Sequence, residues 1–156
     1  MGFVSTIIVV EDVLRSRGLY EGVLGLKVTA DFGIYNVGFE GGLSLYRKAL
    51  FQDLVGNIEI LNKPNSFVLY FEYENIEDVE RKLEARGFEF VHKIQEQPWG
   101  QPAFRVYDYD NHILEIAENM DNVVRRMYRS GQTIEAIAGR TGYSIDEVAL
   151  KVKESG

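Results

Sequence analysis

The first part of the chain, residues 1–50, alternates between apolar strand-like segments and one helical segment. Residues 4–10 are apolar and β-branched, a pattern typical of a strand covered on both faces. Asp12 can cap a following helix, and Gly25 can end it because glycine readily adopts the left-handed conformation. Three short strands are then predicted over residues 26–30, 34–39 and 43–47.

The same order returns in residues 66–119. A strand is predicted over residues 67–73, and Asn75 opens a helix that ends at Gly87. Apolar residues recur at helical spacing within that helix, which gives it one apolar face. Strands follow near residues 88–92, 103–107 and 113–117. A repeat of two βαβββ modules is the simplest account of this pattern.

The segments outside the modules differ from them in composition and in predicted secondary structure. Residues 51–65 contain a glycine, a proline and several asparagines, which predict a linking loop or a lid. From residue 120 onward, helices are predicted over residues 123–129, 133–140 and 144–153, and glycines separate them. Ser144 and Glu147 form a capping box at the start of the last helix. We therefore predict a domain over residues 1–119, with modules of about 1–50 and 66–119, and a helical tail over residues 120–156.

Composition narrows the function classes. The chain has 156 residues, of which 46% are hydrophobic and 26% charged, and these values are typical of a folded domain. Its net charge of -7 argues against electrostatic binding of nucleic acid or anionic lipid by the chain as a whole. The absence of cysteine excludes a thiolate nucleophile and a cysteine-based metal site. No apolar run has the length of a signal peptide or a membrane span, so we expect a cytoplasmic protein.

Several short motifs resemble the vicinal oxygen chelate superfamily, which includes glyoxalase I, bleomycin and fosfomycin resistance proteins and extradiol dioxygenases. They lie at residues 10–12 (Val-Glu-Asp), 19–26, 98–100 (Pro-Trp-Gly) and 108–116. The resemblance implies an α+β fold in which two βαβββ modules form a curled mixed sheet around one pocket, and it implies a homodimer. Because one fold serves many chemistries, the resemblance speaks for the fold more than for an activity.

The resemblance also implies four positions where metal-using members carry His, Glu or Gln ligands. In this chain they fall on Ser5, Leu45, Val68 and Glu115, and a shift of one residue would replace Leu45 by Tyr46. A divalent ion needs several lone-pair donors to replace its waters, and only Glu115 is a plausible one. We therefore expect neither a full metal site nor another cofactor, while a weakly bound divalent ion at Glu115 stays open.

Strand alternation and the resemblance together select side chains for the pocket. The predicted ligand-binding residues are Ser5, Ile7, Val68, Tyr70, Glu72, Trp99, Arg105, Tyr107 and Glu115. Arg105 can neutralise the pocket carboxylates, and Trp99 either stacks on a flat ligand or packs against its own loop. Glu115 is also interpreted as a pocket carboxylate that is either paired with an arginine or faces water. This mixture favours a cationic or hydroxyl-rich amphiphile.

The two histidines and the turn before the last strand carry weaker signals. His92 and His112 are not spaced as a pair, so we interpret both as turn or surface residues rather than as ligands or general bases. Asp108 and Asp110 favour a turn built by hydrogen bonds from the backbone to their side chains, and Asn111 suits a left-handed position in it.

The predicted tail resembles the helix-turn-helix of DNA-binding proteins. A DNA role needs hydrogen-bond donors at the N-terminal end of the last helix, but Asp146 and Glu147 stand there and repel phosphate. We therefore favour a packed bundle or a dimer contact. Its expected buried residues are Val123, Met127, Ile134, Ile137, Ile145 and Val148.

Three functions follow from these observations. The leading hypothesis is a dimeric protein that binds a small organic molecule between its modules without a full metal site. Its expected partners are that ligand and a second copy of the chain, and neither nucleic acid nor a membrane. The alternatives are a lyase, isomerase or dioxygenase that uses Glu115 as general base, and a ligand sensor whose tail docks DNA or protein.

Overall fold

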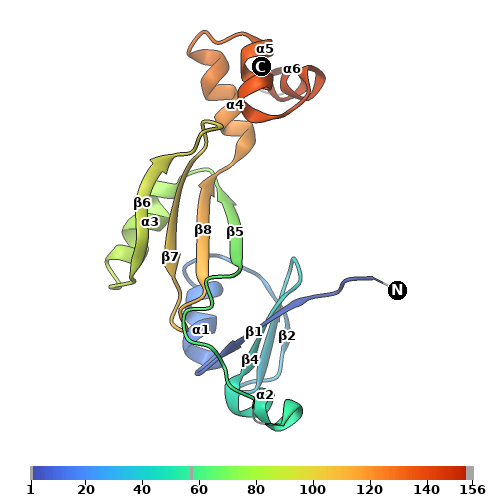
Figure 1. The fold of residues 1–156 in the computed structure, drawn as a ribbon, viewed down its shortest axis with the longest axis vertical. Coiled ribbons are helices and arrows are strands. Elements are labelled where there is room, and N and C mark those ends of the chain that lie inside the picture. Colours follow the sequence, from blue (N-terminus) through green and yellow to red (C-terminus); the bar gives the residue numbers. More distant parts are fainter. Residues whose placement is uncertain (1, 57, 154–156) are drawn as a thin grey trace. The chain divides into compact units, whose positions relative to one another are not determined.

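The computed structural model describes residues 2–56 and 58–153, and its elements follow the expected order (Figure 1). The first module consists of β1 (Thr6–Val10), α1 (Val13–Tyr20), β2 (Val28–Asp31), β3 (Asn36–Phe39) and β4 (Leu43–Arg47). The second consists of β5 (Val68–Tyr73), α3 (Ile76–Glu84), β6 (Phe90–Glu96), β7 (Pro102–Tyr107) and β8 (Ile113–Glu118). The sheets have the orders β1-β4-β3-β2 and β5-β8-β7-β6. The prediction of an α+β fold with two βαβββ modules is confirmed.

Local capping explains where the module helices begin. The backbone N–H of Arg15 donates to Asp12 Oδ1 at 3.0 Å, and the N–H of Asp78 donates to Asn75 Oδ1 at the same distance. Both predicted N-caps are therefore confirmed. The first helix is shorter than predicted, because it ends at Tyr20 and the chain turns until Gly25, whose φ is 76°.

One prediction about the link between the modules is wrong. Residues 51–65 were expected to form a loop, but the first five of them belong to α2 (Lys48–Val55). Strong helix formers such as Ala49, Leu50 and Gln52 favour this helix, and Gly56 ends it with a left-handed φ of 83°. Residues 58–65 carry neither helix nor strand, as expected for a link.

The register of β1 and β4 decides which side chains enter the core of the first module. These strands are parallel, and Ile8 lies opposite Leu45. Both side chains are buried, together with Val10, Leu19 and Tyr20. Residues with odd numbers on β1 and even numbers on β4 therefore face the other side of the sheet.

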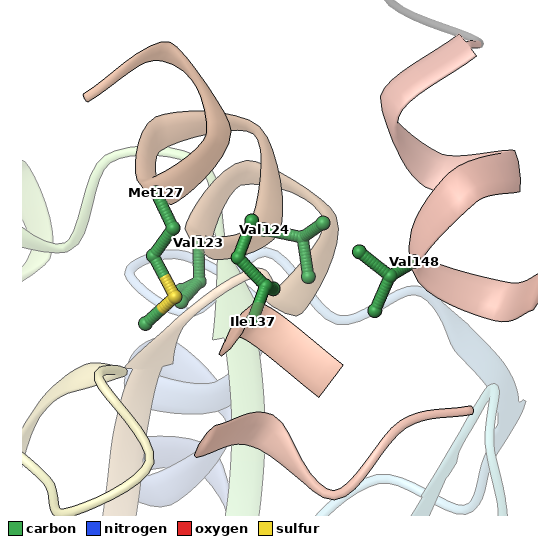
Figure 2. Close-up of a cluster of buried hydrophobic side chains, with 5 residues drawn as sticks. All are labelled: Val123, Val124, Met127, Ile137 and Val148. Atoms are coloured by element: carbon green, nitrogen blue, oxygen red, sulfur yellow. The ribbon is translucent and has the colours of Figure 1, made fainter. Parts of the chain in front are cut away.

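The C-terminal tail is a bundle of α4 (Met120–Arg129), α5 (Ile134–Thr141) and α6 (Ile145–Lys153). Figure 2 shows its buried cluster, which consists of Val123, Val124, Met127, Ile137 and Val148. The capping box is confirmed, since the N–H of Ser144 donates to Glu147 Oε2 at 2.8 Å and that of Glu147 donates to Ser144 Oγ at 3.2 Å. Ile145, in the first turn of α6, was expected in the core but is 53% exposed, whereas Val148 is fully buried.

The contacts of the chain divide it into two compact units. One comprises residues 1–68, 82–89 and 107–113, and the other comprises residues 69–81, 90–106 and 114–156. The second unit thus contains most of the β5-β8-β7-β6 sheet together with the three tail helices. Within the described residues, no helix has both the length and the apolar character needed to cross a membrane.

Candidate functional site

The second unit carries a row of polar side chains on one face of its sheet. Strand alternation produces this row, because Phe104, Leu114 and Ile116 are fully buried on the opposite face. The side chains between them, Arg105 on β7 and Glu115 on β8, therefore point to the other side. We call the set Tyr70, Glu72, His92, Arg105 and Glu115 the polar strip.

The centre of the polar strip is an ion pair. Arg105 Nη2 lies 2.6 Å from Glu115 Oε2, and the exposed fractions of the two side chains are 26% and 13%. Two settings were expected for Glu115, an arginine partner or water, and the structure has the arginine. Charge-assisted hydrogen bonds of this kind are strong when they are shielded from water, so Arg105 holds the carboxylate in place.

His92 extends this pair to the neighbouring strand. Its Nε2 lies 2.8 Å from Arg105 Nη1, and its Nδ1 lies 2.8 Å from the carbonyl oxygen of Lys93. A guanidinium can only donate, so Nε2 is the acceptor and Nδ1 carries the proton. This arrangement belongs to a neutral imidazole. His92 lies on β6 as a partly buried member of the strip, so its interpretation as a turn or surface residue missed its role.

A second chain of hydrogen bonds runs along the β5 side of the strip. The Tyr70 hydroxyl donates to Glu72 Oε1 at 2.7 Å and accepts from Gln101 Nε2 at 2.8 Å. The indole N–H of Trp99 donates to Gln101 Oε1 at 2.8 Å, and Asn119 Nδ2 donates to Glu72 Oε2 at 3.1 Å. Burial raises the pKa of Tyr70 to about 12, so its phenol stays neutral near neutral pH.

The same end of the strip opens into a pocket of about 410 Å³, which we call the end pocket. Its lining residues come from the sheet, from the turn before β7 and from the tail. They are Tyr70, Glu72, Trp99, Gln101, Met120, Thr141, Gly142 and Tyr143. The sequence placed Trp99 near a ligand but gave no signal that the tail would meet it, because periodicity does not reveal which surface a helix covers.

The remaining predicted pocket residues lie in the first unit. Ile7 and Val68 are exposed, and Ser5 Oγ lies 3.1 Å from Ser44 Oγ. The Tyr107 hydroxyl donates to Asn65 Oδ1 at 3.0 Å. Their role in ligand binding stays a prediction.

The positions at which the resemblance implies metal ligands do not fit a divalent ion. Leu45 is fully buried in the first-module core, because its register with Ile8 turns it away from the open face of the sheet. Val68 has no lone pair, and Glu115 is bound to the guanidinium of Arg105. Among residues 2–56 and 58–153, no cluster of three or more His, Asp or Glu side chains has an arrangement that could hold a metal ion.

A buried polar network in the first unit was not predicted. Asp108 Oδ2 accepts from the Tyr20 hydroxyl at 2.7 Å and lies 2.8 Å from His112 Nδ1. His112 was interpreted as a turn or surface residue. It directly follows the turn, but it is only 6% exposed, so its placement on the surface is wrong. The turn is confirmed for Asp108, whose Oδ1 accepts from the N–H groups of Asp110 and His112, and for Asn111, whose φ is 64°. The prediction is wrong for the side chain of Asp110, which accepts from residues outside the turn.

Asp110 joins that turn to the first strand and helix. It accepts from the backbone N–H of Glu11 at 2.8 Å and from Ser16 Oγ at 3.4 Å. Burial raises the pKa of the Asp110 carboxyl. A pocket of about 340 Å³ lies beside this network, and its walls include Lys48, Asn62 and His112.

Comparison with solved structures finds the same fold repeatedly. A protein of unknown function from Agrobacterium tumefaciens is 32% identical with a TM-score of 0.67, and the match covers 76% of this chain and 94% of that chain. A glyoxalase-related enzyme from Fulvimarina pelagi is 21% identical with a TM-score of 0.65, over 77% of this chain and 89% of that one. A lactoylglutathione lyase from Agrobacterium tumefaciens is 17% identical with a TM-score of 0.55, over 76% and 93%.

A comparison with curated proteins finds no match. The family model for the glyoxalase-like domain matches residues 3–121, which are both modules and the first residues of α4. Together with the paired modules, this match shows that the chain belongs to the glyoxalase-like family of the vicinal oxygen chelate superfamily.

Proposed function

We propose that this protein binds a small organic molecule on the polar strip of its second module, and that it does so without a metal ion. The observation that carries the proposal is the contact of 2.6 Å between Arg105 and Glu115. Arg105 supplies the positive charge beside Glu115, the only carboxylate among the four positions at which the resemblance implies metal ligands.

The energetics favour the arginine over an ion. A divalent cation bound by one carboxylate keeps most of its waters and is held weakly. Binding it to Glu115 would also separate a partly buried ion pair and leave Arg105 without its partner, and breaking such a pair costs about 3–5 kcal/mol when it is fully buried. Competition from the guanidinium therefore weakens any metal site at Glu115.

The same face has the properties of a site for an organic ligand. Tyr70 and Trp99 offer aromatic surface, and their polar atoms are fixed by hydrogen bonds to Gln101. Small-molecule sites typically combine apolar or aromatic walls with a few oriented polar groups. Because the donors and acceptors of the strip are already positioned, little side-chain ordering is needed on binding.

The test combines metal analysis with ligand binding. Protein purified without chelators is analysed for Zn, Ni, Mn and Fe, and its thermal stability is then measured against a panel of small aromatic and hydroxylated compounds. We expect less than stoichiometric metal, and stabilisation by some compounds that is lost in Arg105→Met. The matched control is Arg81→Met, which removes an exposed arginine of α3.

Two results would overturn the proposal. One is a tightly bound metal at one equivalent per chain. The other is stabilisation by the same compounds in Arg105→Met and in the wild type. If the wild type turns over a compound and Glu115→Gln folds normally but loses that turnover, the protein is an enzyme rather than only a binding protein.

A further inference from the structure

We infer that the end pocket binds an organic cation, and that the C-terminal tail supplies one wall of this site. The inference rests on the proposed function, because it names the ligand class for the same face of the sheet. Three features of the pocket carry it: an uncompensated carboxylate, three aromatic side chains and the origin of one wall in the tail.

Glu72 provides the charge. Its two carboxylate oxygens accept hydrogen bonds from neutral donors, Tyr70 at 2.7 Å and Asn119 at 3.1 Å. Within the described part of the chain, no Lys, Arg or His side chain forms an ion pair with Glu72. A carboxylate that is solvated only by neutral groups leaves a net negative potential in the pocket and attracts a cation.

Three cationic side chains of the tail have carboxylate partners. Arg140 Nη2 lies 2.6 Å from Glu96 Oε1, and Arg126 Nη2 lies 3.0 Å from Glu118 Oε2. Lys151 pairs with Asp121. The positive charges of these three side chains are therefore balanced by carboxylates other than Glu72.

Aromatic rings line the same space. Trp99 is 37% exposed and Tyr70 is 50% exposed, so both rings remain accessible. Tyr143 of the tail completes the set, and the ammonium of Lys151 already lies 4.9 Å from its ring centroid. The faces of such rings attract ammonium groups, and aromatic residues beside a carboxylate are typical of sites for quaternary ammonium ligands.

Two of the three rings, those of Trp99 and Tyr70, are held in place by the buried Gln101. Its side chain accepts from Trp99 and donates both to Tyr70 and to the carbonyl oxygen of Glu118, each at 2.8 Å. Gln101 is 2% exposed. The aromatic wall therefore exists before a ligand binds.

The tail closes the pocket with Thr141, the last residue of α5, and with Gly142 and Tyr143, which lie in the connection to α6. These residues lie beyond position 121, where the match to the glyoxalase-like domain ends. The tail is fixed to the turn before β7, since Arg126 Nη2 donates to the carbonyl oxygen of Gly100 at 3.1 Å. The pocket of about 410 Å³ therefore depends on a segment that the matched domain does not include.

The experiment uses the single tryptophan of the chain as the reporter, because Trp99 lines the pocket. Its fluorescence is measured in the full-length protein during titration with benzyltrimethylammonium, and benzyl alcohol is the uncharged comparison. We expect the cation to change the fluorescence saturably and benzyl alcohol to bind at least tenfold more weakly. Loss of the charge in Glu72→Gln should weaken cation binding about tenfold, and Tyr143→Leu should weaken it about fivefold.

The matched control is Glu74→Gln, which removes an exposed carboxylate just beyond β5 and should leave the affinity unchanged. Equal affinities in Glu72→Gln and Glu74→Gln would overturn the inference, and so would equal binding of benzyl alcohol and the cation. If the cation fails to bind but other compounds still stabilise the wild type and not Arg105→Met, only this inference fails. If the cation binds through Glu72 while no compound depends on Arg105, the end pocket stands and the proposed role of the ion pair fails.

Discussion

Replacing Tyr20 by Phe removes one hydroxyl group from the interior of the first module. Tyr20 is fully buried, and its hydroxyl donates to Asp108 Oδ2 at 2.7 Å. A hydrogen bond to a charged group contributes about 1.5–3 kcal/mol to stability. Asp108 would keep the N–H groups of Asp110 and His112 and the ring nitrogen of His112. We therefore expect the loss to be about 2 kcal/mol, in the lower half of that range.

Urea unfolding followed by circular dichroism measures this loss. With a slope of about 2 kcal/mol per molar urea, the midpoint should fall by about 1 M without a change in slope. The matched control is Tyr35→Phe, which removes a hydroxyl from a side chain that is 54% exposed and should change stability by less than about 0.5 kcal/mol. If Tyr20→Phe and Tyr35→Phe unfold at the same urea concentration, the buried network adds nothing to stability and our reasoning is refuted.

Three further changes have defined outcomes. Gly100→Ala should lower the thermal midpoint and cost about 2 kcal/mol, because φ is 85° and the new Cβ would overlap a buried methionine of α4, whereas Gly139→Ala meets open space and should be neutral or stabilising. Ser144→Ala should cost about 1 kcal/mol in urea unfolding, because it removes the cap of α6. Burial raises the pKa values of Tyr70 and Tyr73 from 10.0 to about 12, so their neutral forms are favoured in the folded state. The stability that this contributes is complete below pH 10 and is lost as the pH rises to about 12, which unfolding at a series of alkaline pH values would measure; unchanged stability across that window would contradict it.

The pattern of apolar and polar residues was sufficient to predict the two modules and several of their local contacts. Helix caps at Asp12, Asn75 and Ser144 were predictable because capping depends on residues three positions apart. For Glu115 the sequence left two settings open, an arginine partner or water, because a partly buried carboxylate needs one or the other, and the structure has the arginine.

The position of Leu45 was misjudged although the sequence contained the signal. Residues 43–45 read Leu-Ser-Leu, and strand alternation alone puts both leucines on the core face and Ser44 on the other. The family resemblance assigned Leu45 to a ligand position, and a shift of one residue reverses the face of every side chain on a strand.

Other features depend on contacts that no local pattern encodes. Tyr20 and Asp108 are 88 positions apart in the chain, so neither the burial of His112 nor its network followed from the turn motif. The contact of the tail with the turn that carries Trp99 is of the same kind, because amphipathic periodicity predicts an apolar face without naming its partner.

The guanidinium beside Glu115 is attached to the chain by covalent bonds, and this has a consequence for the physiology of the protein. A cation of this kind cannot be removed by a chelator, exchanged for a competing ion or lost when the supply of trace elements falls. The positive charge beside Glu115 is therefore supplied by the chain itself at translation.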